Sequence, residues 1–157
     1  MVRGQEREHR FLRGLAWVPC LGFLVMWPTS YGFYTSVGID VDRHEEPAAI
    51  EAHVRFRWPG NGAFLMGADQ FRLPPDRKLV PLDLGAALFH APRRPQPRSI
   101  WNLRGFWLIH EEYPPTELPV REPEKAAASW VGVPSWLPVV LTGAWPLLLA
   151  WRRRERT

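Results

Sequence analysis

The sequence predicts a membrane α plus all-β protein, in which two transmembrane helices flank a small antiparallel sheet of four to six strands. Two charge-free runs, Gly14–Ile39 and Ala126–Trp151, contain no Asp, Glu, Lys, Arg or His. At ~1.5 Å rise per helical residue, each run is longer than the ~30 Å hydrocarbon core of a bilayer. Arginines lie on the outer side of each run, and segments of alternating polarity lie between them. Together these observations indicate a membrane hairpin that holds a polar domain between two anchors.

The positive charge of the chain is concentrated at its ends. The net charge is +4, yet the stretch Asp40–Lys125 holds 12 Lys and Arg against 13 Asp and Glu. The positive-inside rule therefore places both termini in the cytoplasm, in a multi-pass protein of the inner membrane. The same distribution argues against a nucleic-acid partner, because the middle of the chain carries no basic excess.

The predicted domain organisation has five parts. In chain order they are a cytoplasmic N-terminal segment (1–13), transmembrane helix 1 (14–34), an extracytoplasmic β domain (35–133), transmembrane helix 2 (134–151) and a cytoplasmic tail (152–157).

The first hydrophobic segment has an apolar centre, Leu15–Trp27, followed by the aromatic and hydroxyl-bearing stretch Pro28–Tyr34, which is typical of a membrane interface. The alternative is a cleaved signal peptide, since a basic region precedes a short apolar one. No small-x-small cleavage site follows closely, so retention is favoured. The single cysteine, Cys20, excludes an intramolecular disulfide and a cysteine-based zinc site, and we expect it to be buried in lipid.

The clearest strand is Ile50–Trp58, where apolar residues alternate with Glu51, His53, Arg55 and Arg57. The Asn61–Gly62 pair that follows predicts a hairpin, with Ala63–Met66 returning antiparallel.

The next segments give mixed signals. We predict a short strand at Phe71–Leu73, at best an edge strand at Leu79–Leu84, and either a helical turn or a strand at Ala86–Phe89. An exposed loop at Ala91–Arg98 should lead to a strong strand at Ile100–Ile109. A loop at Glu111–Lys125 and a last strand at Ser129–Val133 complete the predicted domain.

The alternation also predicts which strand residues form the core. Phe56 and Trp107 should be buried, and Arg55, one residue from Phe56, should point into solvent.

The second hydrophobic segment opens at Pro134–Pro138, because proline is tolerated in the first turn of a helix. Trp136 and Trp151 would form two aromatic belts, and Pro146 should kink the helix.

Two stretches resemble a family of uncharacterised two-span bacterial membrane proteins. One is the exit from the first hydrophobic run, Trp27–Gly38, and the other is the entry to the second, Val131–Pro138, where such proteins often have His in place of Ser135. The resemblance implies a hairpin with a small extracytoplasmic β domain and implies no activity.

The sequence contains no catalytic motif, and we expect no cofactor. A metal site joining His53, His110 and Glu112 is conceivable, but their spacing matches no ligand signature, and solvated histidine is the default on a polar strand face. Another histidine, His44, precedes the first strong strand, and the acidic pair Glu111–Glu112 should point to opposite faces of its strand.

The function therefore stays open between two classes. The favoured one is a non-enzymatic, membrane-anchored extracytoplasmic domain with a structural or protein-interaction role. Its partners would be the lipid bilayer and a membrane or envelope protein. The alternative is a small extracytoplasmic metal-dependent hydrolase that uses His53, His110 and Glu112.

Overall fold

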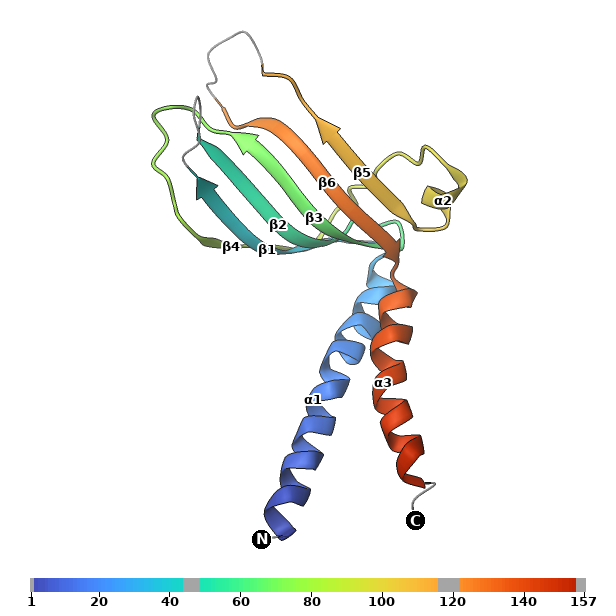
Figure 1. The fold of residues 1–157 in the computed structure, drawn as a ribbon. Helices are drawn as coiled ribbons and strands as arrows, with labels where there is room; N and C mark the ends of the chain where they lie inside the picture. Colours follow the sequence, from blue (N-terminus) through green and yellow to red (C-terminus); the bar gives the residue numbers. More distant parts are fainter. Residues whose placement is uncertain (1, 44–48, 116–121, 155–157) are drawn as a thin grey trace.

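The computed structural model describes residues 2–43, 49–115 and 122–154, which form one sheet with two helices projecting together from one end of it (Figure 1). The elements in chain order are α1 (Val2–Thr29), β1 (Tyr34–Arg43), β2 (Ile50–Trp58), β3 (Ala63–Arg72), β4 (Asp83–His90), α2 (Ile100–Leu103), β5 (Trp107–Glu112), β6 (Glu124–Pro134) and α3 (Trp136–Arg154).

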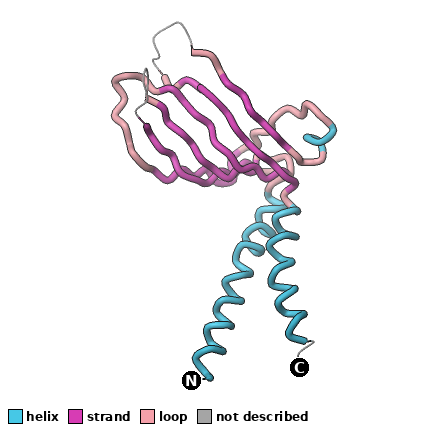
Figure 2. Tube along the Cα trace, viewed as in Figure 1, coloured by secondary structure: helices cyan, strands magenta, loops and turns pink. Residues whose placement is uncertain are grey.

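The sheet has six strands in the order β4-β1-β2-β3-β6-β5, and every neighbouring pair is antiparallel. This confirms the predicted antiparallel sheet. Figure 2 shows the strands in a single layer, with α1 and α3 leaving it side by side. All strands of the described residues therefore belong to this one sheet.

The predicted transmembrane helices are wrong, and so are the two-span membrane fold class and the inner-membrane location derived from them. Within the described part of the chain, no helix is both long enough and apolar enough to cross a bilayer. The reason is that each charge-free run is divided between a helix and a strand: α1 ends at Thr29 and β1 begins at Tyr34, while β6 continues to Pro134 before α3 starts. The charge-free helical parts, Gly14–Thr29 and Trp136–Trp151, are each only about 24 Å long.

Several local expectations are confirmed and others are wrong. The hairpin at Asn61–Gly62, the exposed loop at Ala91–Arg98 and the last strand before α3 are present. The predicted strand at Ile100–Ile109 is wrong in its first half and right from Trp107, where β5 begins. The first half forms α2, whose N-cap Ser99 accepts a hydrogen bond from the Asn102 backbone N–H. The ambiguous segment Ala86–Phe89 is part of an edge strand, β4.

The buried core lies on the predicted face of β5 but on the face of β2 opposite to the one predicted. The residues of this covered face include Arg57, Leu65, Trp107 and Trp130, and the core cluster on it is made of Ala63, Leu65, Trp107, Ala128 and Trp130. Trp107 is only 6% exposed, as expected, but Phe56 on the other face is 47% exposed. The prediction for Phe56 is wrong because the segment after β4 lies over the polar side of β2, where Trp107 and Trp130 supply the apolar contacts that β2 lacks.

Arg55 is also not the solvated residue that its alternation suggested. Its guanidinium forms a two-pronged ion pair with Asp40, and both side chains are 16% exposed. The pair lies across two glycines, since a Cβ at Gly85 would collide with both partners and one at Gly38 with Arg55. Glycine at these positions lets long charged side chains lie flat on the sheet.

The two helices are joined to the sheet at one turn. The Gly62 N–H donates to the Ser30 carbonyl just after α1, and the Ser135 N–H just before α3 donates to the Gly62 carbonyl, each at 2.9 Å. Gly62 has φ +80°, and a Cβ there would also strike the Tyr31 ring. The β2–β3 turn therefore fixes where both helices begin to diverge from the sheet.

The helix pair packs through small residues and exposes apolar ones. Cys20 is 7% exposed, its Sγ lies 3.8 Å from the Val139 carbonyl oxygen, and a Cβ on Gly143 would meet that Sγ at 3.2 Å. Cys20 is thus buried by the neighbouring helix. The outer sides carry exposed apolar side chains: Trp17, Val18, Leu21, Leu24, Val25, Trp27, Trp136, Val140, Leu141, Leu147, Leu148 and Trp151.

We expect Trp107→Ala to lower the free energy of unfolding by about 3–5 kcal/mol and Phe56→Ala by only about 1 kcal/mol, because only Trp107 is in the buried cluster. Arg55→Ala should cost about 1–2 kcal/mol, since it leaves a half-buried Asp40 without its partner. Denaturant titration of the full chain measures all three. A larger loss for Phe56→Ala than for Trp107→Ala would contradict the assignment of faces.

Cys20 should react slowly with a maleimide in the folded protein and rapidly after denaturation. Gly143→Leu should speed the reaction by forcing the helices apart at their contact, whereas Ala144→Leu, on an exposed position beside it, should not. Equal rates in the two variants would show that the helix pair does not pack as described.

Candidate functional site

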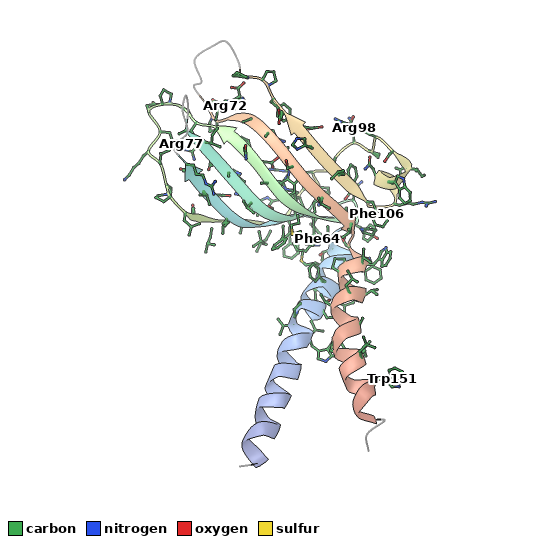
Figure 3. All side chains as sticks on the ribbon, viewed as in Figure 1. Phe64, Arg72, Arg77, Arg98, Phe106 and Trp151 are labelled. Carbon is green, nitrogen blue, oxygen red and sulfur yellow. The ribbon has the colours of Figure 1, made fainter. Side chains whose placement is uncertain are left out.

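A trough of about 1190 Å³ lies on the covered face, between the sheet and the segment Pro92–Phe106. Strands β2, β3, β6 and β5 contribute Arg57, Leu65, Trp130 and Trp107 to it, and the crossing segment contributes arginines. Figure 3 shows Arg98 and Phe106 beside β5 and α2, away from Arg77 at the far end of the sheet. The trough is therefore built from both the sheet and the long β4–β5 connection.

The base of the trough is apolar and aromatic. Trp107 is 6% and Trp130 3% exposed, and both pack with Leu65 and Ala128 in the core cluster. Ile109 and Tyr113 pack against this cluster from β5 and just beyond it. These residues hold the covered face rigid beneath the polar groups of the trough.

A buried carboxylate lies at the centre of the polar groups. Asp69 on β3 is 5% exposed, accepts a hydrogen bond from the Trp130 Nε1–H at 3.1 Å, and pairs with Arg57 at 2.9 Å and Lys125 at 3.2 Å. The Arg57 guanidinium also lies 3.9 Å from the centre of the Trp130 ring, in a cation–π contact. Four residues from three strands are thus held in one network.

The pKa of Asp69 is lowered. Its burial acts to raise the pKa, but the hydrogen bond from Trp130 and the charges of Arg57 and Lys125 outweigh that effect. Asp69 is therefore ionised at neutral pH and balances two cations within the trough.

The rim of the trough is formed by arginines on an anchored loop. The Arg93 N–H donates to the Pro59 carbonyl at 2.9 Å, and the Arg94 side chain donates to the Gly60 and Tyr31 carbonyls at 2.7 and 3.1 Å. These bonds tie the rim to the same β2–β3 turn that joins the helices. Arg98 pairs with Glu111 on β5 at 3.0 Å.

The lining of the trough has an excess of positive charge. It includes five cationic residues, Arg57, Arg93, Arg94, Arg98 and Lys125, against two acidic ones, Asp69 and Glu111. Both acidic residues already have partners in that set. Within the described ranges, neither Arg93 nor Arg94 forms an ion pair with a carboxylate: the Arg93 guanidinium lies 4.9 Å from the centre of the Tyr34 ring, and Arg94 donates to carbonyls. Their positive charges are therefore not neutralised by an acidic side chain of the described residues.

The structure does not bring the residues of the conceivable metal site together. His53 on β2 lies on the covered face, where its Nε2 is 3.0 Å from Glu51, whereas His110 and Glu112 lie on the other face of β5 and are 3.8 Å apart. Strands β3 and β6 separate β2 from β5. Among residues 2–43, 49–115 and 122–154, no group of three possible ligands could hold a metal ion. His44 lies outside these residues.

The acidic pair is divided between the faces, as expected. Glu111 faces the trough, where a hydrogen bond from Tyr113 lowers its pKa, and Glu112 is exposed on the opposite side.

Sequence reasoning missed the trough because its residues come from segments that were assigned separately. The signal that could have found it is the Pro-rich, Arg-rich stretch Ala91–Arg98, which looks like an ordinary exposed loop until it is seen to cross the sheet. Trp107 was correctly expected in the core, and Trp130 is buried beside it, whereas Trp101 on α2 is 59% exposed at the trough.

Comparison of the chain with protein-family models, with curated proteins and with solved structures gives no match. The resemblance to two-span bacterial proteins is consequently untested, and the site is interpreted from its own geometry.

We expect Asp69→Asn to lower the free energy of unfolding at pH 7 by about 3 kcal/mol, because it leaves Arg57 and Lys125 without their anion. The pKa of Asp69 is lowered by folding, so its contribution is present above the ordinary value of 3.8 and is lost as the pH falls below it. Denaturation followed from pH 7 to pH 3 should therefore show a smaller loss of stability in Asp69→Asn than in the natural protein. An equally steep loss would contradict the ionised state of Asp69.

Proposed function

We propose that this chain is a non-enzymatic protein-interaction domain whose trough binds an extended, acidic segment of a partner protein. The observation that carries the proposal is the pair of arginines, Arg93 and Arg94, held on the rim without a carboxylate partner among the described residues. Guanidinium groups bind carboxylates in a planar, two-pronged geometry, which favours acidic side chains as ligands.

The size of the trough favours a chain segment over a small molecule as its ligand. Its volume of about 1190 Å³ is above the ~300–1,000 Å³ of ordinary small-molecule pockets. The aromatic base offers contact to apolar side chains between the acidic ones, as Trp101 and Trp107 line the same trough.

A fluorescein-labelled decapeptide of alternating Glu and Val tests the proposal, with the matching Lys–Val peptide as the opposite-charge probe. The acidic peptide should bind the full chain, and the basic one should not. Arg93→Glu should weaken binding about 10- to 100-fold, the loss expected for one charge-assisted hydrogen-bonded pair. Fluorescence anisotropy measures the affinity.

The control is Arg77→Glu, which reverses an equally cationic residue at the far end of the sheet (Figure 3) and should leave binding unchanged. A thermal melt of each variant checks that the fold is kept. Equal binding of both peptides, no binding of the acidic peptide up to about 1 mM, or tighter binding of a single-stranded oligonucleotide would contradict the proposal.

A further inference from the structure

The face of the sheet opposite the trough carries a continuous apolar row that crosses all six strands. We call this surface the open face. It consists of the central row, which contains Val37, Phe56, Met66, Leu108 and Val131, and of the row that lies next to it on the same side of the sheet. Backbone pairing places its central row in the order Ala86, Val37, Phe56, Met66, Val131 and Leu108. The exposed fraction of the large side chains in it runs from 42% at Val37 to 82% at Leu108.

The neighbouring row extends the apolar surface from β4 to β3 and ends in two polar residues, Ser129 and His110. It runs Leu84, Ile39, Val54, Ala68, Ser129 and His110. Leu84 is 81%, Val54 47% and Ile39 39% exposed. The two rows together contain no Asp, Glu, Lys or Arg.

Helix α1 covers this face only at the end next to the helices. Phe23 packs edge-on against Phe64 with ring centres 5.2 Å apart, and against Trp58 at 6.3 Å. Figure 3 shows Phe64 on the side of the sheet from which the helices leave. Beyond Phe64, the exposure of the two rows shows that no described segment covers them.

The size of the open face approaches half of a small specific interface. With ~4.8 Å between strands and ~6.8 Å between successive rows on one face, six strands and two rows cover roughly 400 Å² of flat sheet. Two such faces give about 800 Å² before the protruding side chains are counted, close to the ~1,000 Å² that a specific interface needs. A lone patch of this size is at the upper end of what monomeric proteins expose.

We infer that the open face packs against the same face of a second copy of this chain. An apolar row without charges can meet its own copy about a two-fold axis with no like-charge repulsion, as an isologous interface requires. The product is a two-layer sandwich, the usual way in which a single sheet buries an apolar face. This inference does not rest on the proposed peptide binding, because Arg57, Asp69 and Trp130 lie on the other side of the sheet and the two surfaces meet only at the β5 edge, where Leu108, His110 and Val131 also border the trough.

Disulfide capture in expressing cells tests the inference. In a Cys20→Ser background, Met66→Cys places the one thiol near the middle of the open face, and mild oxidation should link two copies. Leu103→Cys, on the equally exposed helix α2, is the matched control and should give little cross-linking. Comparable cross-linking at both positions would overturn the inference.

Sedimentation of the purified full chain provides the second measurement. The natural protein should be dimeric at micromolar concentration, and Met66→Glu should weaken the dimer at least 10-fold while the thermal melt stays unchanged, because Met66 is already 55% exposed. Leu103→Glu should leave the dimer intact. If Leu141→Glu on helix α3 abolished association and Met66→Glu did not, the contact between copies would lie on the helices and the inference would be overturned. So would Met66-dependent flotation of monomers with phosphatidylcholine vesicles.

Discussion

The organisation of this protein depends on one constraint: its six strands lie in a single layer, and the described residues cover one face of the sheet but only the helix end of the other. The long connection from β4 to β5 crosses the face that carries Arg57, Asp69 and Trp130. Burying that face requires the charges on it to be neutralised within the protein. The Asp69 network does this, because one carboxylate accepts a hydrogen bond from an indole and pairs with two cations. The network therefore balances the charges of the covered face, although the buried Nε of Arg57 and Nε1 of Trp107 have no hydrogen-bond partner among the described residues.

The turn at Gly62 connects three parts of the chain that are far apart in sequence. Backbone hydrogen bonds from this turn reach Ser30 and Ser135, and the preceding residues Pro59 and Gly60 hold the loop that carries Arg93 and Arg94. The helices, the β2–β3 hairpin and the rim of the trough therefore share one anchor. A change at Gly62 would affect the helix pair and the trough together, although the two have no residue in common.

The two faces of the sheet offer different chemistry to a partner. The covered face presents a trough with a net excess of cations over an aromatic base, which suits an acidic segment. The open face presents two rows without Asp, Glu, Lys or Arg, which suits another apolar sheet. Because successive residues of a strand point to opposite sides, one strand can serve both surfaces, as β2 does with Arg57 and Phe56.

The sequence by itself determined the local structure where a short pattern is decisive: the alternating strand Ile50–Trp58, the Asn61–Gly62 hairpin and the antiparallel pairing that such a turn imposes. It did not determine where the helices end, because a charge-free run such as Gly14–Ile39 is compatible with one long helix or with a helix followed by a strand. It also did not determine which face of the sheet is buried. Alternation divides Arg55 and Phe56 between two faces, but only the path of the segment Pro92–Phe106 decides which face is covered, and that path depends on contacts between residues distant in sequence.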